Sequence, residues 1–290
     1  MRGVRALWVY GAPMEGNAMP TRRAVFASDH GFYPSSRGTL LAMLEELVPE
    51  RDDAAAAVAV VAPHAGYVFS GGVAGAVYSR VVVPDAVILL SVNHGRSPGA
   101  EFALFDEGAW QTPLGDVPVA TELVAAIAAE CPTVAADCDA HAMEHSGEVH
   151  LPFLKHRNAD VRIAPICIMR SSLPRLQEFG AGLARAAERL GQPVLLVAST
   201  DMTHFEPHEV ASKKDHEVID EILALDEAAM MEVVERRRVS MCGHDPVAAA
   251  LAYAKARGAT KAELVDYKTS GDTPYGSRAE VVGYAGIIIT

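Results

Sequence analysis

The chain has 290 residues, half of them apolar, and its formal net charge is −12 at pH 7. A chain of this length and apolar content can bury one large core. We therefore expect residues 1–290 to form a single α/β domain, with two closely packed halves as the alternative. The chain is acidic overall and has no stripe of basic residues that could neutralise phosphates. This argues against nucleic acid or an anionic membrane as a partner. The only basic cluster, Arg236 to Arg238, ends a helical pattern, where cations complement the helix dipole.

Membrane and export signals are absent from the sequence pattern. No apolar stretch approaches the ~20 residues that a membrane-spanning helix needs, and the N-terminus lacks a signal-peptide pattern. The four cysteines, at positions 131, 138, 167 and 242, show no CxxC spacing. This usage favours a reducing compartment, so we expect a cytoplasmic protein.

Strands and helices alternate along the chain after an irregular start. The predicted strands are residues 58–62, 86–91, 161–168, 194–199, 262–267 and 280–289. The predicted helices are residues 40–47, 71–80, 121–130, 176–190, 210–225, 228–236 and 246–257. This alternation predicts right-handed βαβ crossovers and a mainly parallel central sheet flanked by helices, although the last two strands are free to pair antiparallel.

Three apolar runs of this chain each lead to a histidine. The runs are residues 58–62, 86–91 and 194–199, and the histidines at or just past their ends are His64, His94 and His204. Continuous Val, Ile and Leu indicate strands buried on both faces of a parallel sheet, and ligands bind such sheets at the carboxyl ends of the strands. We therefore expect the three histidines to converge on one crevice.

His64 and His94 are candidate metal ligands. Neutral imidazole is the commonest metal ligand in proteins, and two histidines with one anionic ligand suit a divalent transition metal. The third ligand has three possible sources, Asp201, His204 and Cys242. A thiolate would favour copper, zinc or ferrous iron. Taken alone, a cysteine such as Cys242 is more often a small buried apolar residue, and Asp201 is equally explained as a helix cap.

A second polar cluster contains Glu144, His145 and Glu148. If this stretch is helical, the two glutamates share a face and His145 points elsewhere. His145 could then act as a general acid or base, or orient a metal ligand. The alternative is a helix N-terminus whose acidic side chains complement the dipole. The other histidines are expected to be surface or structural residues: His30, His141, His150, His156, His208, His216 and His244.

Several short motifs together carry a family resemblance. In chain order they are His30-Gly31-Phe32-Tyr33-Pro34, Pro63-His64-Ala65-Gly66-Tyr67, Asn93-His94, Thr112-Pro113-Leu114-Gly115, Glu144-His145-Ser146, Ser199-Thr200-Asp201 with His204, Cys242-Gly243 and Val282-Gly283-Tyr284. From about residue 25 to the C-terminus, the chain resembles the MEMO family, of the AmmeMemoRadiSam system protein B type. The number and order of the motifs make this resemblance specific.

The resemblance implies a fold similar to the class III extradiol dioxygenases, which hold non-heme iron with two histidines and a glutamate. It implies three metal ligands: His64, His94 and, in place of that glutamate, Cys242. It also implies three further site residues: His204 as the acid/base histidine, with Asp201 and His145 as polar neighbours.

The implied function is a metal-dependent redox enzyme with a small-molecule or dioxygen site. Iron(II) is the expected ion, with copper or zinc as alternatives. A thiolate changes the electronics of the iron and is itself oxidisable, so ring cleavage does not follow from the resemblance. The alternatives are an adaptor protein that holds a peptide or protein partner in the same crevice and, third, a zinc hydrolase. Relatives grouped in the AmmeMemoRadiSam system imply partners that include a radical-SAM protein.

Overall fold

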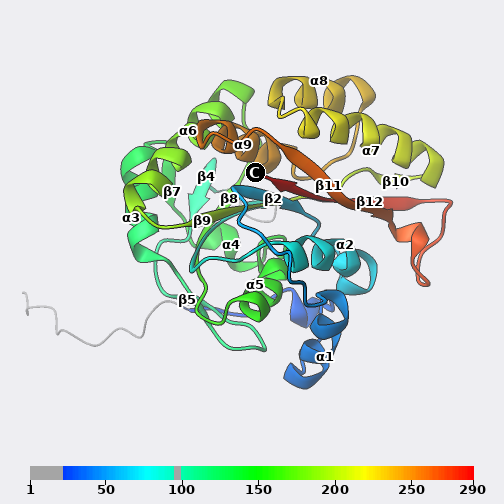
Figure 1. The fold of residues 1–290 in the computed structure, drawn as a ribbon, viewed down its shortest axis with the longest axis horizontal. Coiled ribbons are helices and arrows are strands. Elements are labelled where there is room, and N and C mark those ends of the chain that lie inside the picture. Colours follow the sequence, from blue (N-terminus) through cyan, green and yellow to red (C-terminus); the bar gives the residue numbers. More distant parts are fainter. Residues whose placement is uncertain (1–21, 95–98) are drawn as a thin grey trace, which may run out of the picture.

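The computed structural model describes residues 22–94 and 99–290 of the chain. Within these residues, a nine-stranded sheet forms the centre of the molecule (Figure 1). In spatial order its strands are β10 (His204–Glu206), β12 (Val281–Ile289), β2 (Ala59–Ala62), β9 (Val194–Ser199), β3 (Ala86–Val92), β8 (Arg162–Ile168), β4 (Phe102–Leu104) and β7 (Val134–Ala136), with β11 (Ala262–Thr269) paired to β12.

The middle of this sheet is parallel. Strands β2, β9, β3 and β8 run in one direction, while β12 pairs antiparallel with β2, β10 and β11, and β4 pairs antiparallel with β8. Every residue of β2, β3 and β9 is buried, as the continuous apolar runs predict. The predicted α/β class and mainly parallel centre are confirmed, and so is the antiparallel pairing of the last two predicted strands.

Helices cover both faces of the sheet. They are α1 (Arg37–Leu47), α2 (Tyr67–Arg80), α3 (Thr121–Glu130), α4 (Asp139–Ala142), α5 (Leu151–Arg157), α6 (Leu173–Leu190), α7 (His208–Leu223), α8 (Glu227–Arg237) and α9 (His244–Ala256). Helices α6, α7, α8 and α9 lie on one side, and α1, α2 and α5 lie on the other (Figure 1). The buried face of α9 contacts β2, β3 and β9, and α2 contacts β2, β11 and β12.

The predicted elements are present, with α3 and β9 at the predicted bounds and α2 beginning four residues earlier. The sequence pattern missed the shortest elements, because two or three residues carry no periodicity. Among them is a small sheet of β1 (Arg22–Arg23), β5 (Ala109–Trp110) and β6 (Val117–Pro118). The 3-10 turns Ser28–His30, Glu148–His150 and Ser270–Asp272 were also missed.

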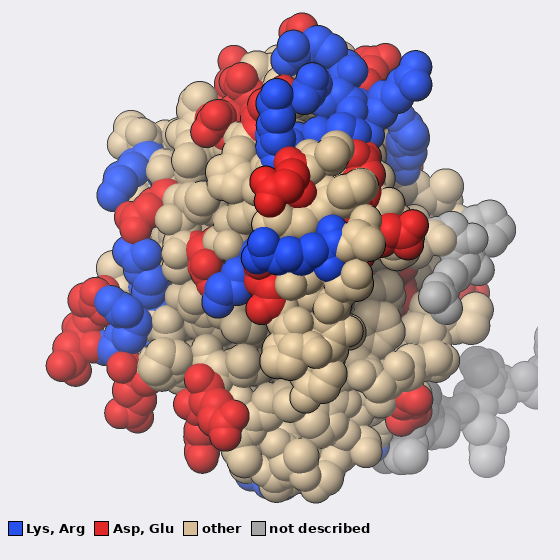
Figure 2. Space-filling model, turned by 90° about the vertical axis from the view of Figure 1, so that its right-hand side faces the viewer, with Lys and Arg blue, Asp and Glu red and all other residues tan. Residues whose placement is uncertain are grey.

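The surface carries mixed charge. Figure 2 shows Lys and Arg gathered at the top of one face, with acidic side chains among them. Arg236 and Arg237 occupy the last turn of α8, as predicted, and Arg237 pairs with Glu217 of α7 at 3.0 Å. Across residues 22–94 and 99–290, none of the helices combines the length and apolarity needed to cross a membrane.

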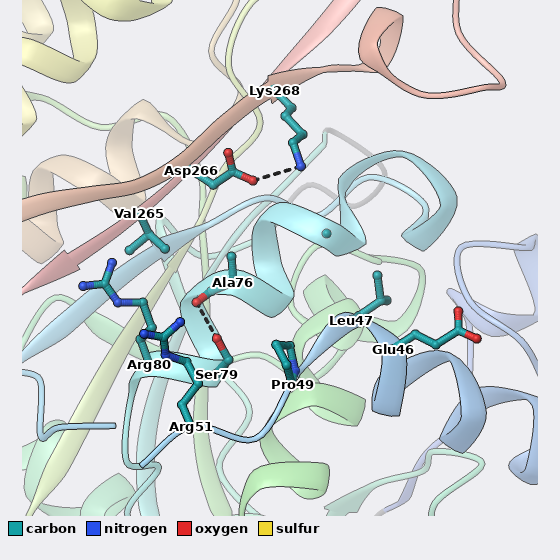
Figure 3. A pocket seen from close by; sticks show the side chains of 11 residues that line it. Glu46, Leu47, Pro49, Arg51, Ala76, Ser79, Arg80, Val265, Asp266 and Lys268 are labelled. Atoms are coloured by element: carbon teal, nitrogen blue, oxygen red, sulfur yellow. Dashed lines mark hydrogen bonds and ion pairs between the residues drawn. The ribbon is translucent and has the colours of Figure 1, made fainter. Parts of the chain in front are cut away.

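A pocket of about 620 Å³ lies between the end of α1, the outer side of α2 and β11 (Figure 3). Its basic side chains each pair with a carboxylate: Arg51 with Asp53, Arg80 with Glu263 and Lys268 with Asp266. These ion pairs neutralise the pocket wall. His64 precedes the other end of α2, so this pocket lies apart from the predicted metal ligands.

The packing of α2 against α1 depends on glycine. A Cβ at Gly75 would lie 2.0 Å from the carbonyl oxygen of Leu47, whereas a Cβ at Gly72 meets nothing within 4 Å. Gly75→Ala must push the two helices apart, so we expect it to lower the free energy of unfolding by at least about 1–3 kcal/mol. Gly72→Ala, the matched control on the same helix, should raise it by about 0.5–1 kcal/mol. Urea unfolding measures both, and a Gly75→Ala variant as stable as the wild type contradicts this packing.

Candidate functional site

His64 lies just past the end of β2 and is fixed on three sides. Its backbone N–H donates to Asp201 Oδ1 at 2.8 Å, and its ring Nδ1 lies 2.7 Å from Ser199 Oγ. The other ring nitrogen, Nε2, lies 3.3 Å from Cys242 Sγ. The residue is only 2% exposed. Burial, followed by the nearby charge of His94, lowers the pKa of His64 to about 3, so its ring is neutral at pH 7.

His94 follows β3 and is held by Glu144. The Glu144 carboxylate accepts the backbone N–H of His94 at 3.0 Å and its ring Nδ1–H at 2.9 Å. Because a carboxylate only accepts, Nδ1 carries a hydrogen, and in the form of the ring that can bind a metal the lone pair is on Nε2. Burial acts to raise the pKa of Glu144, but the hydrogen bonds and charge of His94 hold it below its usual range. Glu144 is therefore ionised at neutral pH.

Cys242 is placed by the turn between α8 and α9. A Cβ on Gly243 would lie 2.3 Å from the Ser199 carbonyl oxygen, so only glycine lets this turn lie against the end of β9. The Asp201 N–H donates to Cys242 Sγ at 3.2 Å. Burial, and then the charge of Asp201, raise the pKa of the Cys242 thiol. In the absence of metal the sulfur therefore carries its proton.

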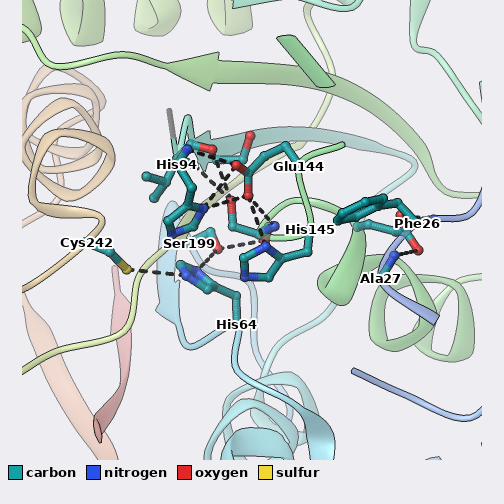
Figure 4. A network of polar contacts seen from close by, with 12 residues as sticks. Phe26, Ala27, His64, His94, Glu144, His145, Ser199 and Cys242 are labelled. Atoms are coloured by element: carbon teal, nitrogen blue, oxygen red, sulfur yellow. Dashed lines mark hydrogen bonds and ion pairs between the residues drawn. The ribbon is translucent and has the colours of Figure 1, made fainter. Parts of the chain in front are cut away.

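Three separate segments thus bring the predicted ligands together. One atom each from His64, His94 and Cys242 lie within 4.8 Å of one another (Figure 4). A second group, His94, Glu144 and His145, also meets this spacing. In that second group, His94 Nδ1 and the Glu144 carboxylate are already hydrogen-bonded to each other. The first group therefore has more atoms free to bind a metal.

His145 lies on the edge of the same cluster. Its ring stacks on His94, with centroids 4.8 Å apart, and meets His64 edge to face at 5.4 Å. Its Nδ1 is buried, has no hydrogen-bond partner among the residues described, and lies 3.4 Å from Glu144 Oε1. Burial, and then the charge of His64, lower the pKa of His145 to about 3. The structure therefore provides a neutral imidazole beside the candidate ligands.

Asp201 and His204 follow β9 and stand next to the three candidate ligands. Asp201 Oδ2 lies 4.0 Å from His64 Nε2. Burial raises the pKa of Asp201, and the His64 amide and the nearby His204 partly offset this rise. His204 Nδ1 donates to the Ser240 carbonyl at 2.9 Å. Among the residues described, neither Asp201 nor His204 belongs to a group with metal-ligand spacing, so of the three sources considered for a third ligand, only Cys242 has it.

A pocket of about 790 Å³ opens beside Cys242. It runs along α8 and the turn before α9, and its wall includes Arg170, Arg238, Ser240 and His244. The carbonyl of Ser240 is the acceptor of the His204 ring. The pocket therefore adjoins both Cys242 and the element that holds His204.

The segment from Glu144 to Glu148 is not the helix considered from the sequence. Residues 144–147 form an irregular turn, because Glu144 Oε1 accepts the Ser146 N–H at 2.9 Å and so competes with helical hydrogen bonding. The two glutamates also have different partners. Glu148 is fully buried and pairs with Arg23 at 2.5 Å, whereas Glu144 pairs with His94.

Two polar side chains of this site were not singled out from the sequence. Ser199 Oγ contacts His64 Nδ1, and His150 Nε2 lies 2.9 Å from the same hydroxyl. The rule that selected His64, a polar residue at the end of a buried strand, also selects Ser199. His150 was expected to be a surface or structural residue. It is buried within the hydrogen-bond network, and no spacing in the sequence indicates this.

Comparison with known proteins gives consistent matches over most of the chain. The profile of the family described as Memo-like protein matches residues 22–288. The chain is 43% identical over 271 residues to a MEMO1 family protein of Methanopyrus kandleri, covering 89% of this chain and 95% of the relative. It is 41% identical over 260 residues to a MEMO1 family protein of Archaeoglobus fulgidus, with the same two coverages.

A solved structure supports the fold alone. The crystal structure of an uncharacterized protein from Escherichia coli K12 matches with a TM-score of 0.53 and 13% sequence identity. The match covers 78% of this chain and 98% of that one.

The buried histidines make stability depend on pH. In the folded, metal-free protein the pKa is about 3 for His64, His145 and His150 and about 4 for His141, in each case mainly through burial. The unfolded chain binds these protons near pH 6.5, so stability is fully present above that pH and is lost as the pH falls below it. We expect the free energy of unfolding to fall by about 1.4 kcal/mol per pH unit for each such histidine. Urea unfolding of chelator-treated protein between pH 7 and pH 5 measures this, and a flat profile contradicts it.

Proposed function

The chain belongs to the family of Memo-like proteins, and on that premise we propose that it is a metal-dependent redox enzyme. The ion is held by His64, His94 and Cys242. Iron(II) is the ion we expect first, with copper or zinc as the alternatives. The reaction takes place in the cytoplasm, where a thiol ligand stays reduced.

The observation that supports this proposal is the set of free donor atoms. The Nδ1 atoms of His64 and His94 are engaged by Ser199 and Glu144, which leaves the two Nε2 atoms for a ligand. Cys242 Sγ lies beside one of them. Two imidazole nitrogens and one thiolate form a donor set that suits iron(II), copper or zinc better than magnesium or calcium. The residues present therefore fit a transition metal.

When bound, the metal would supply redox chemistry and an open coordination position for a small molecule. The chain's own residues would manage protons. The neutral His145 ring has a buried Nδ1 that makes no hydrogen bond to any described residue, and His204 keeps Nε2 free by donating Nδ1–H to Ser240, so both are candidate acids or bases. Asp201 holds the backbone of His64 and stands near its ring.

The pocket beside Cys242 would receive the small-molecule substrate. Its position next to the sulfur supports this placement, and its wall carries charges of both signs, from Arg170 and Arg238 and from Glu232 and Glu235. The AmmeMemoRadiSam resemblance adds a protein partner, of the radical-SAM class, as the source or recipient of that molecule.

The ligand assignment predicts a specific loss of metal. The wild type, loaded anaerobically with iron(II) and desalted, should retain about one ion per chain. His64→Ala, His94→Ala and Cys242→Ala should each lose most of it, because each removes one of three donors. His216→Ala, which alters an exposed histidine of α7, is the matched control and should retain the wild-type content. Elemental analysis measures all of these, and equal metal in wild type and His64→Ala rules out the site.

A separate variant tests the role of His204. His204→Ala should keep its metal, because its ring lies outside the group of three donors. It should nonetheless change any oxygen-dependent activity and its pH profile. Metal loss as complete as that of His94→Ala would make His204 a ligand instead.

The redox role of Cys242 has its own prediction. Ferrous- or cuprous-loaded wild type should consume dioxygen faster than free metal, and Cys242→Ser and Cys242→Glu should change that rate, because a thiolate is a soft and oxidisable donor. An oxygen electrode gives the rates. Uptake equal to that of free metal in all three proteins would favour the adaptor function, and uptake unaffected by either substitution would remove Cys242 from the reaction.

A further inference from the structure

We propose that Tyr78, His150 and Ser199 form a buried chain of hydrogen bonds that holds the His64 ring with Nδ1 protonated and Nε2 free, which makes His150 and Tyr78 positioning residues for the metal site. The expected effect on metal binding rests on the proposed function, but the hydrogen bonds themselves can be tested without metal.

The hydroxyl of Ser199 fixes the direction of the chain. In the described part of the chain its oxygen has three hydrogen-bonding neighbours: the Ser146 carbonyl at 2.8 Å, His64 Nδ1 at 2.7 Å and His150 Nε2 at 2.9 Å. A hydroxyl has one hydrogen and can accept two more. Because a carbonyl only accepts, the hydroxyl hydrogen must go to Ser146. Both imidazoles must therefore donate, and His64 carries its hydrogen on Nδ1.

Tyr78 fixes the tautomer of His150 in the same way. A neutral imidazole that donates from Nε2 accepts at Nδ1, and the Tyr78 hydroxyl lies 3.0 Å from that atom. The Tyr78 ring is itself held by stacking on Phe153, with centroids 5.2 Å apart and planes 13° apart. Tyr78 and His150 are fully buried, so water does not compete for these bonds.

His150 thereby restricts the Ser199 hydroxyl. The His150 N–H and the Ser146 carbonyl together fix the position of Ser199 Oγ, and with its hydrogen on Ser146 the remaining lone pair faces His64 Nδ1. Loss of the His150 donor leaves Oγ held by the Ser146 carbonyl alone, so the side chain can also rotate away from that carbonyl and donate to His64 Nδ1. That rotation would move the His64 hydrogen to Nε2, the atom that faces Cys242, where it would block a metal.

Ser146 connects the surroundings of the two proposed ligand histidines. Ser146 accepts from Ser199 through its carbonyl, and its N–H donates to Glu144, the partner of His94. Its side chain also accepts the Val92 N–H at 3.0 Å, at the end of the strand that leads to His94. A change at His150 should therefore reach His64 first and leave the Glu144–His94 hydrogen bond in place.

The first test uses chelator-treated protein and the ¹⁵N NMR signals of the histidine rings, with His64 assigned by the signal lost in His64→Gln. The wild type should show His64 protonated at Nδ1 alone. His150→Leu should give a mixture of tautomers at His64. His150→Gln, whose amide can donate to Ser199 and accept from Tyr78, should restore the wild-type signal. Wild-type His64 protonated at Nε2, or His150→Leu with unchanged signals, overturns the proposal.

The second test measures the affinity for zinc(II) by competition with a chelator. His150→Leu should bind about 10–100-fold more weakly than the wild type, the range typical of lost partners of metal ligands. His150→Gln should remain close to wild type, and Tyr78→Phe, which removes only a hydroxyl, should give a smaller loss. If His150→Leu does not fold, Tyr78→Phe decides, and wild-type tautomer and affinity in that variant overturn the proposal. A wild type that binds no zinc contradicts the proposed function, while the NMR result still judges the hydrogen-bond chain.

Discussion

The hydrogen bonds that the Nδ1–H groups of His64 and His94 donate are the constraint on which the rest of the site depends. One is accepted by a serine hydroxyl at the end of β9, and the other by the carboxylate of Glu144. Each sets the orientation of its ring and leaves Nε2 without a proton. The sulfur of Cys242 then lies 3.3 Å from His64 Nε2, because Gly243 allows the turn to approach the sheet. The parallel sheet brings the ends of β2, β3 and β9 close together. The hydrogen bonds then orient the histidine rings so that their Nε2 atoms are free to bind a metal.

The segment that supplies Glu144 is anchored to the N-terminal part of the described chain. Glu148 accepts from Arg23, from the backbone N–H groups of Phe26 and Ala27, and from the Tyr33 hydroxyl. Arg23 also donates to the Glu144 carbonyl at 2.6 Å. Both charges are buried, and removing one partner of such a pair typically costs about 3–5 kcal/mol. The N-terminal strand and the site segment therefore stabilise each other.

Much of this arrangement could be predicted from the sequence, for a physical reason. Buried parallel strands read as continuous apolar runs, and their carboxyl ends meet at one edge of the sheet, so His64 and His94 stood out. Cys242 has no such signal of its own, since a cysteine in a turn is equally a buried apolar residue, and it was selected only through the family motifs. The roles of Ser199 and His150 depend on which lone pairs and hydrogens are left over in a packed core. No pattern in the sequence records that count.

Residues 144–148 show where an argument from spacing fails, because the helix considered for them does not form. Spacing alone put Glu144 and Glu148 on one face, but the Glu144 side chain accepts the Ser146 N–H and turns the backbone instead. A local side-chain hydrogen bond of this kind competes with a helix of a few residues, and here the tertiary contacts to His94 and Arg23 decide the outcome.

The coordination of a bound metal is the decisive measurement for the three proposed ligands. X-ray absorption at the zinc edge, on protein loaded with one zinc(II) ion per chain, reports the number and type of the nearest atoms. We expect one sulfur at about 2.3 Å and two imidazole nitrogens at about 2.0–2.1 Å. A first shell without sulfur, or with a single imidazole, would contradict the assignment of His64, His94 and Cys242 as the metal ligands.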